Sequence, residues 1–130
     1  MRTISIVLMS LFLFSCGSSD IKQEGYFKDS GKNRIFTFSY KNGTTESEIL
    51  SHAKKQMHTA PRLTGCYYFI EGSAIPRDGI TLARSLFSAN NVIDRFANEI
   101  KYAYIKSGYD SETFANCIDN PKHDLCNSTQ

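Results

Sequence analysis

Three histidines and four cysteines are the side chains of this chain best suited to binding a metal or attacking a substrate. His52 and His58 lie six residues apart, so they would not share one face of a helix in the way that an i, i+4 metal-binding pair does. His123 lies in a polar stretch near the C-terminus. The sequence therefore predicts three surface histidines and indicates no metal, no cofactor and no catalytic residue.

The cysteines after residue 60 offer either a disulfide or a thiol nucleophile. Cys117 and Cys126 flank the polar segment IDNPKHDL, whose Asn-Pro pair is typical of a turn, so a local disulfide is the first expectation. A bridge from Cys66 to either of them is the alternative. Cys66 opens the apolar run CYYFI, which favours a buried free thiol over an accessible nucleophile.

One loop carries charges in an arrangement that could bind a ligand. The segment EGSAIPRDGITLARS joins an apolar run to a helical pattern. Loops at the carboxyl ends of central strands are where open α/β sheets place ligands, and a helix N-terminus favours anions. Arginine adds charge-assisted hydrogen bonds to carboxylate or phosphate. The predicted binding residues are Glu71, Arg77, Asp78 and Arg84; an ordinary capped loop with solvated charges is the alternative.

The elements that would position these groups begin with a strand and a helix. RIFTFSY (34–40) alternates between apolar and polar residues and predicts a half-buried strand, with a hairpin partner around residues 26–27. Thr45 and Glu48 form a capping box, which begins an amphipathic helix that ends before Pro61. Ile49, Leu50, Ala53 and Met57 would form its buried face.

The second half of the chain predicts a further helix and three strands. Residues 66–70 are apolar on both faces, as in a central strand reached by a right-handed crossover. A second helix starts with Asp78 as its N-cap and ends between residues 91 and 97, although its pattern could continue past residue 100. Strands at 100–106 and 112–118 follow. The fold class is α+β, one domain with a small mixed sheet of about four to five strands and two main helices.

The N-terminal segment is predicted to be an export signal. A single arginine precedes an apolar run from Ile4 to Phe14, which is too short to span a bilayer and typical of a signal peptide. Leu13-Phe14-Ser15-Cys16 resembles the lipobox of bacterial lipoproteins, in which the cysteine becomes the lipidated N-terminus. Ordinary cleavage after Gly17, giving a soluble periplasmic protein, is the alternative.

The resemblance implies how the chain is divided and where it resides. Residues 1–15 would be the signal peptide, 16–24 the lipidated cysteine and a tether, and 25–130 the domain. Gly17, after the cysteine, implies lipid attachment to the outer membrane of a Gram-negative bacterium, with the domain facing the periplasm. The several acyl chains, palmitate among them, on Cys16 would give a stable anchor.

The charge balance limits the functions to be expected. The chain has 15 basic residues, one of them Arg2 in the signal peptide, against 13 acidic residues, which gives no basic face for nucleic acid. We expect a non-enzymatic lipoprotein that binds another envelope protein, of the assembly, exclusion or immunity type. The alternatives are binding of a small anionic ligand or cell-wall fragment at residues 71–84 and, more remotely, thiol chemistry on Cys66.

Overall fold

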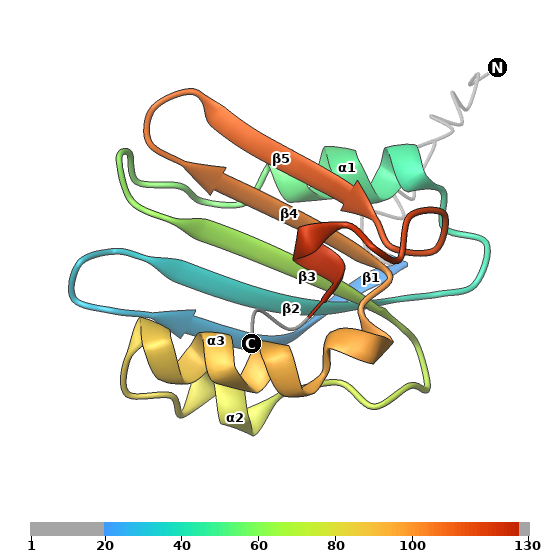
Figure 1. Ribbon diagram of the computed structural model, residues 1–130, viewed down its shortest axis with the longest axis horizontal. Coiled ribbons are helices and arrows are strands. Elements are labelled where there is room, and N and C mark those ends of the chain that lie inside the picture. Colours follow the sequence, from blue (N-terminus) through green and yellow to red (C-terminus); the bar gives the residue numbers. More distant parts are fainter. Residues whose placement is uncertain (1–19, 128–130) are drawn as a thin grey trace, which may run out of the picture.

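The computed structural model describes residues 20–127, which form a five-stranded sheet with helices on both faces (Figure 1). The strands lie side by side in chain order. β2 and β3 are parallel, and every other neighbouring pair is antiparallel. The predicted α+β class, with a mixed sheet and two main helices, is confirmed. The elements are β1 (Ile21–Lys28), β2 (Arg34–Tyr40), α1 (Glu46–Lys54), β3 (Thr64–Ile70), α2 (Asp78–Thr81), α3 (Leu86–Arg95), η1 (Ala97–Glu99), β4 (Tyr102–Ser107), β5 (Ser111–Asn116) and η2 (Asp124–Cys126).

β1 and β2 form the predicted hairpin, but β1 begins earlier than expected. The strand starts at Ile21, so residues 21–24 belong to the sheet, whereas the sequence predicted a tether up to residue 24. Its first half reads as a polar linker because β1 is an edge strand, and edge strands keep charged side chains. The signal peptide and Cys16 lie outside the described residues.

α1 covers one face of the sheet as the sequence predicts. Its capping box is present, and Ile49 and Ala53 pack on the face formed by Phe36 and Phe38. The helix ends at Lys54, where the Gln56 side chain donates to the carbonyl of His52. Met57 therefore lies beyond the helix and is 66% exposed, so its predicted burial is wrong.

α2 and α3 cover the opposite face, and this changes the environment of β2. Every residue of β2 is buried, whereas the alternation predicted a half-buried strand. Two of its buried polar side chains are satisfied, since Thr37 Oγ1 donates to the Pro76 carbonyl at 2.7 Å and Ser39 Oγ donates to Glu24 at 2.8 Å. Buried polar groups of this kind are hydrogen-bonded, but in the sequence they read as solvent-facing.

The helix predicted from Asp78 is two helices. α2 has only four residues, and Asp78 is its first residue and caps nothing. The N-cap is Ser85, which begins α3 by accepting a hydrogen bond from the Ser88 amide. α3 ends at Arg95, inside the predicted window, and β4 and β5 follow as expected. No helix within residues 20–127 is long and apolar enough to cross a membrane.

Candidate functional site

The predicted ligand loop lies at the end of the sheet where β1 begins and β2 and β3 end. A cleft of about 570 Å³ opens there, and it is lined by only two of the four predicted residues, Glu71 and Arg77. Asp78 and Arg84 are exposed and do not line it. The sequence missed the other residues of the cleft, which are Asp20, Ile21, Lys22, Glu24, Ser39 and Lys41.

Arg77 is already paired inside this cleft. Its Nε donates to Glu24 Oε2 at 2.7 Å, and the Glu24 side chain is only 10% exposed. Burial by itself would raise the pKa of Glu24, but the hydrogen bonds from Arg77 and Ser39 outweigh it and hold that pKa below its ordinary value. The cleft therefore contains its own counter-charge for the arginine that was predicted to bind an anion.

A β-bulge brings Glu24 to this position. The register of β1 against β2 shifts between Gln23 and Gly25, which leaves Glu24 as the extra residue. At Gly25, β1 lies very close to β2 and to the loop that carries Arg77. A Cβ at this position would lie 2.8 Å from Thr37 Oγ1 and 3.0 Å from the Arg77 carbonyl. A bulge depends on strand pairing, so the sequence alone carried no signal for Glu24.

The residues considered for nucleophilic or metal chemistry have structural roles. Cys66 is fully buried and unpaired, as predicted, and burial raises the pKa of its thiol. Three or more His, Cys, Asp or Glu side chains placed to hold a metal ion are found nowhere between residues 20 and 127.

The three histidines are partly buried, not surface residues as predicted. His52 Nδ1 lies 2.8 Å from the Tyr68 hydroxyl, and burial followed by the nearby Lys55 lowers the pKa of His52. His58 Nε2 donates to the Gly108 carbonyl, and His123 Nδ1 accepts from the Leu125 amide. Each ring holds a loop or helix in place.

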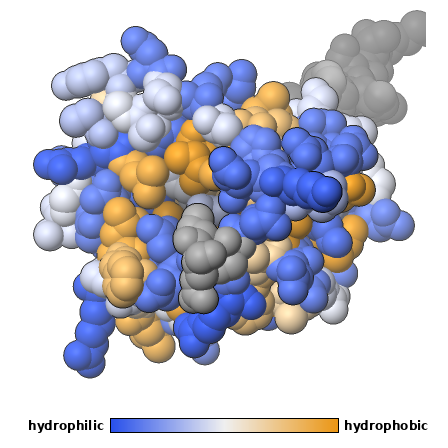
Figure 2. Space-filling model, in the orientation of Figure 1, coloured by the Kyte–Doolittle hydropathy of each residue, from blue (hydrophilic) through white to orange (hydrophobic). Residues whose placement is uncertain are grey.

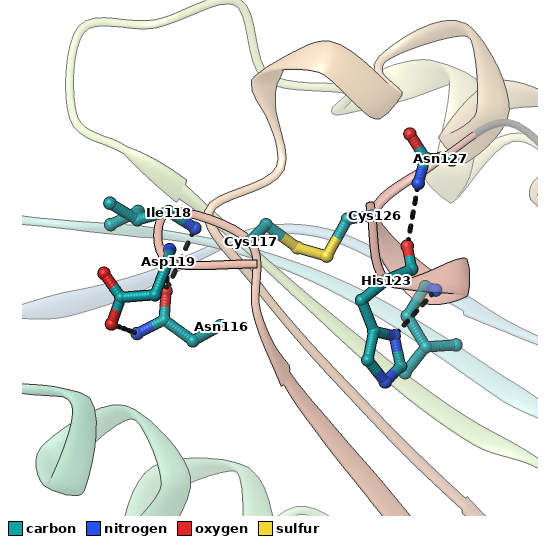
Figure 3. The surroundings of a disulfide bond; sticks show 8 residues. Asn116, Cys117, Ile118, Asp119, His123, Cys126 and Asn127 are labelled. Carbon is teal, nitrogen blue, oxygen red and sulfur yellow. Dashed lines mark hydrogen bonds between the residues drawn. A yellow bond between two sulfur atoms is a disulfide. The ribbon is translucent and has the colours of Figure 1, made fainter. Parts of the chain in front are cut away.

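The predicted disulfide between Cys117 and Cys126 is confirmed, with a Cα–Cα distance of 5.5 Å (Figure 3). Asn116 stabilises the start of the closed loop by accepting from the amides of Ile118 and Asp119. The Asn127 side chain donates to the His123 carbonyl at its end. The C-terminal segment is thereby fixed beside the end of β5, where Figure 1 shows it in red.

The opposite end of the sheet carries three connections that are bonded to one another. We call them the three-loop tip: the β1–β2 turn (29–33), the segment 55–63 and the β4–β5 turn (108–110), on the left in Figure 1. The Leu63 amide donates to Asn33 Oδ1 at 2.9 Å, His58 Nε2 donates to the Gly108 carbonyl at 3.0 Å, and the Gly108 amide donates to the Pro61 carbonyl. These bonds join the three connections into one ordered surface.

Large apolar side chains are exposed mainly at this end. Among residues 20–127, five are prominently exposed; two of them lie on the three-loop tip and two lie between the end of α2 and the first turn of α3. Figure 2 shows apolar atoms in a band on the left half of the face drawn, the half that holds the tip, and in further patches at the top and on the right. The five are Met57 (66%), Leu82 (76%), Phe87 (75%), Tyr109 (74%) and, at the other end, Ile118 (54%).

Comparison with known proteins gives no relative: no protein-family model, no curated protein and no solved structure matches this chain.

Proposed function

We propose that this protein is a non-enzymatic lipoprotein that binds another protein of the cell envelope, in an assembly, exclusion or immunity role. The observation that carries the proposal is the exposure of Leu82 and Phe87, each about three-quarters exposed, together with that of Met57 and Tyr109 on the three-loop tip. Side chains of this kind are costly to leave in water, and apolar patches with aromatic residues mark protein–protein contacts.

The proposed anchor suits this surface. A lipid on Cys16 would sit five residues before Ile21, a span of at most ~18 Å. β1 then runs eight residues away from that point, about 25 Å along the sheet. On the outer membrane, this would hold the three-loop tip and the start of α3 out in the periplasm, within reach of a partner.

The first test is crosslinking of the full-length protein in the cells that make it. We expect one abundant envelope protein to be captured by the wild type and to be reduced with Cys16→Ala, which cannot be lipidated. A double variant, Leu82→Ser with Phe87→Ser, should lose the captured protein, whereas Ile118→Ser removes a similarly exposed side chain from the other end and should retain it.

Two results would contradict this function. One is that the wild type captures no protein. The other is turnover of a substrate by the purified protein that disappears on a single side-chain change, which would make it an enzyme. Equal capture by the double variant and by Ile118→Ser would exclude Leu82 and Phe87 from the contact.

A second candidate function is the binding of a small anionic ligand or cell-wall fragment in the cleft at residues 71–84. It is favoured by Lys22 and Lys41, which line the cleft and have no ion pair among the described residues. Inorganic phosphate is the probe, and its binding should disappear in Lys22→Ala with Lys41→Ala at an unchanged melting temperature. A wild type that binds no phosphate would remove this candidate.

A further inference from the structure

Arg34 is a buried cation without a counter-charge. Its side chain lies in the first position of β2, where the residue is only 3% exposed. No carboxylate within residues 20–127 forms an ion pair with it. Taking a guanidinium out of water without a paired anion is strongly unfavourable, so a native protein that keeps one there calls for an explanation.

The hydrogen bonds of Arg34 leave one edge of the guanidinium unsatisfied. Nη1 donates to Thr59 Oγ1 at 2.8 Å and to the Lys32 carbonyl at 3.3 Å. Within residues 20–127, Nη2 donates only to the sulfur of Met57 at 3.3 Å, and Nε is buried without a partner. A thioether is a weak acceptor. Nε and Nη2 form one side of the guanidinium fork, the side on which a carboxylate binds with two parallel hydrogen bonds.

Met57 is the side chain whose sulfur contacts this edge, at Nη2. It is 66% exposed and lies beyond the end of α1, so it is the neighbour of Arg34 best able to move. The surroundings are fixed: Asp29 accepts from the amide and side chain of Asn33, and Asn33 in turn accepts from the Leu63 amide. The loop beside the edge is therefore held in place, whereas the side chain that contacts Nη2 is exposed and unbranched.

The three-loop tip also has the charge that would attract an acidic partner. Three acidic side chains lie close to it: Glu112 pairs with Lys54, Asp29 accepts hydrogen bonds from Asn33, and Asp110, in the β4–β5 turn, is exposed. The basic side chains at the ends of its strands and in its loops outnumber the acidic ones, and none has an ion pair in the described part of the chain. They are Lys28, Lys32, Lys55, Arg62 and Lys106.

We propose that the Nε–Nη2 edge of Arg34 is the receptor for a carboxylate on an acidic segment of another envelope protein, which takes the place of the Met57 sulfur. The inference rests on the proposed function and adds to it a binding position and the chemistry of the partner. The surrounding basic side chains attract the acidic segment, and Arg34 fixes one carboxylate by two charge-assisted hydrogen bonds.

Met57→Glu tests the proposal without removing the arginine. The new carboxylate can reach Nη2 from the position of the sulfur, so the protein would carry its own ligand. We expect a raised melting temperature, which excludes misfolding, together with a loss of partner capture of about tenfold or more. Met57→Gln is the matched control: it has the same length and no charge, and it should keep the partner.

A second measurement asks whether the edge accepts a carboxylate, with acetate as the probe. The purified full-length protein in detergent is labelled with nitrogen-15, and the Arg34 Nε–H resonance is followed in sodium acetate and in sodium chloride at equal ionic strength. A saturable shift caused only by acetate, present in Met57→Gln and absent in Met57→Glu, is the expected result. No shift of the wild-type resonance overturns the proposal.

The two measurements separate the failure of the site from the failure of the function. If Met57→Glu captures the same protein as the wild type, the Arg34 proposal is wrong while the protein-binding function stands. If the wild type captures no protein, the proposed function and the protein partner both fail, even where acetate shifts the Arg34 resonance.

Discussion

Each end of the sheet holds an arginine in a fixed position, but only one of the two has a counter-charge in the described part of the chain. Arg77, in the cleft, is half-exposed and pairs with the nearly buried Glu24. Arg34, under the three-loop tip, is buried and has only neutral acceptors. The arginine that the sequence indicates as a binding residue is thus electrostatically satisfied. Arg34, which has an unsatisfied hydrogen-bond donor, lies in a strand, where the alternating sequence pattern predicts a packing role and no binding role.

The comparison teaches that the exposure of a charged residue is a poor guide to whether its charge is available. An exposed arginine can be neutralised by a neighbour, whereas a buried one can keep a hydrogen-bonding edge that only a ligand satisfies. Substitutions can remove the Glu24–Arg77 pair or its support in the cleft, and they can test whether Arg34 at the tip lacks a counter-charge.

Gly25→Ala should have the largest effect, because it damages the cleft through its backbone. The added Cβ would lie 2.8 Å from Thr37 Oγ1 and 3.0 Å from the Arg77 carbonyl, so strand and loop must separate. We expect a loss of about 2–3 kcal/mol in the free energy of unfolding, measured by urea denaturation. Gly31→Ala is the control at the tip, where the nearest atom is Asp29 Oδ1 at 3.4 Å, an ordinary van der Waals distance, and it should cost far less. If both variants lose the same unfolding free energy, the close contact of Gly25 with Thr37 and the Arg77 carbonyl does not stabilise the cleft.

The second prediction exchanges each arginine for methionine. Arg77→Met leaves the Glu24 carboxylate nearly buried beside Ser39 alone, and it should lower the free energy of unfolding by about 1–2 kcal/mol. Arg34→Met replaces an uncompensated buried cation by an apolar side chain of similar length, and it should be neutral or stabilising. Thermal unfolding of both variants decides the matter. A loss for Arg34→Met as large as for Arg77→Met would mean that the three hydrogen bonds of Arg34 already satisfy its charge.

Features that depend on near neighbours in the chain could be predicted from the sequence. The Thr45–Glu48 capping box is a local pattern, and so is the loop closed by Cys117 and Cys126. The apolar run from Cys66 to Ile70 identified the central strand because a strand covered on both faces has no polar side.

Features that depend on contacts between residues far apart in the chain could not be predicted from the sequence. Thr37 and Ser39 are polar and read as solvent-facing, yet Pro76 and Glu24 satisfy them in the core. The break between α2 and α3 is set by Ser85 acting as a cap, which the continuous apolar pattern conceals. Arg34 gave no signal, since a charged residue at the start of a strand is ordinary until its burial is known.

The third prediction uses acidic pH to protonate Glu24 and so to remove its ion pair with Arg77. The pKa of Glu24 is lowered in the folded state, so its pair with Arg77 stabilises the protein fully above the ordinary value of 4.5. That contribution is lost as the pH falls below 4.5 through the lower folded pKa. Glu24→Gln should therefore reduce the loss of stability between neutral and acidic pH by less than about 1 kcal/mol, because Arg77 is half-exposed and the pair is screened. An unchanged pH profile in this variant would show that the pair contributes nothing.

The last pair of variants includes the smallest expected effect and separates an effective hydrogen-bond acceptor from a weak one. Ser39→Ala removes a hydroxyl that donates to Glu24 at 2.8 Å, and it should cost about 1 kcal/mol of unfolding free energy. Met57→Leu removes the sulfur from Nη2 of Arg34 while it keeps an apolar cover, and it should cost less than about 0.5 kcal/mol, because a thioether accepts weakly. Denaturant titrations of the two variants at neutral pH give the comparison. If Met57→Leu costs as much as Ser39→Ala, the sulfur is an effective partner and the Nε–Nη2 edge is less open than its geometry indicates. If it costs little, Arg34 is a cation whose best acceptor must come from another molecule.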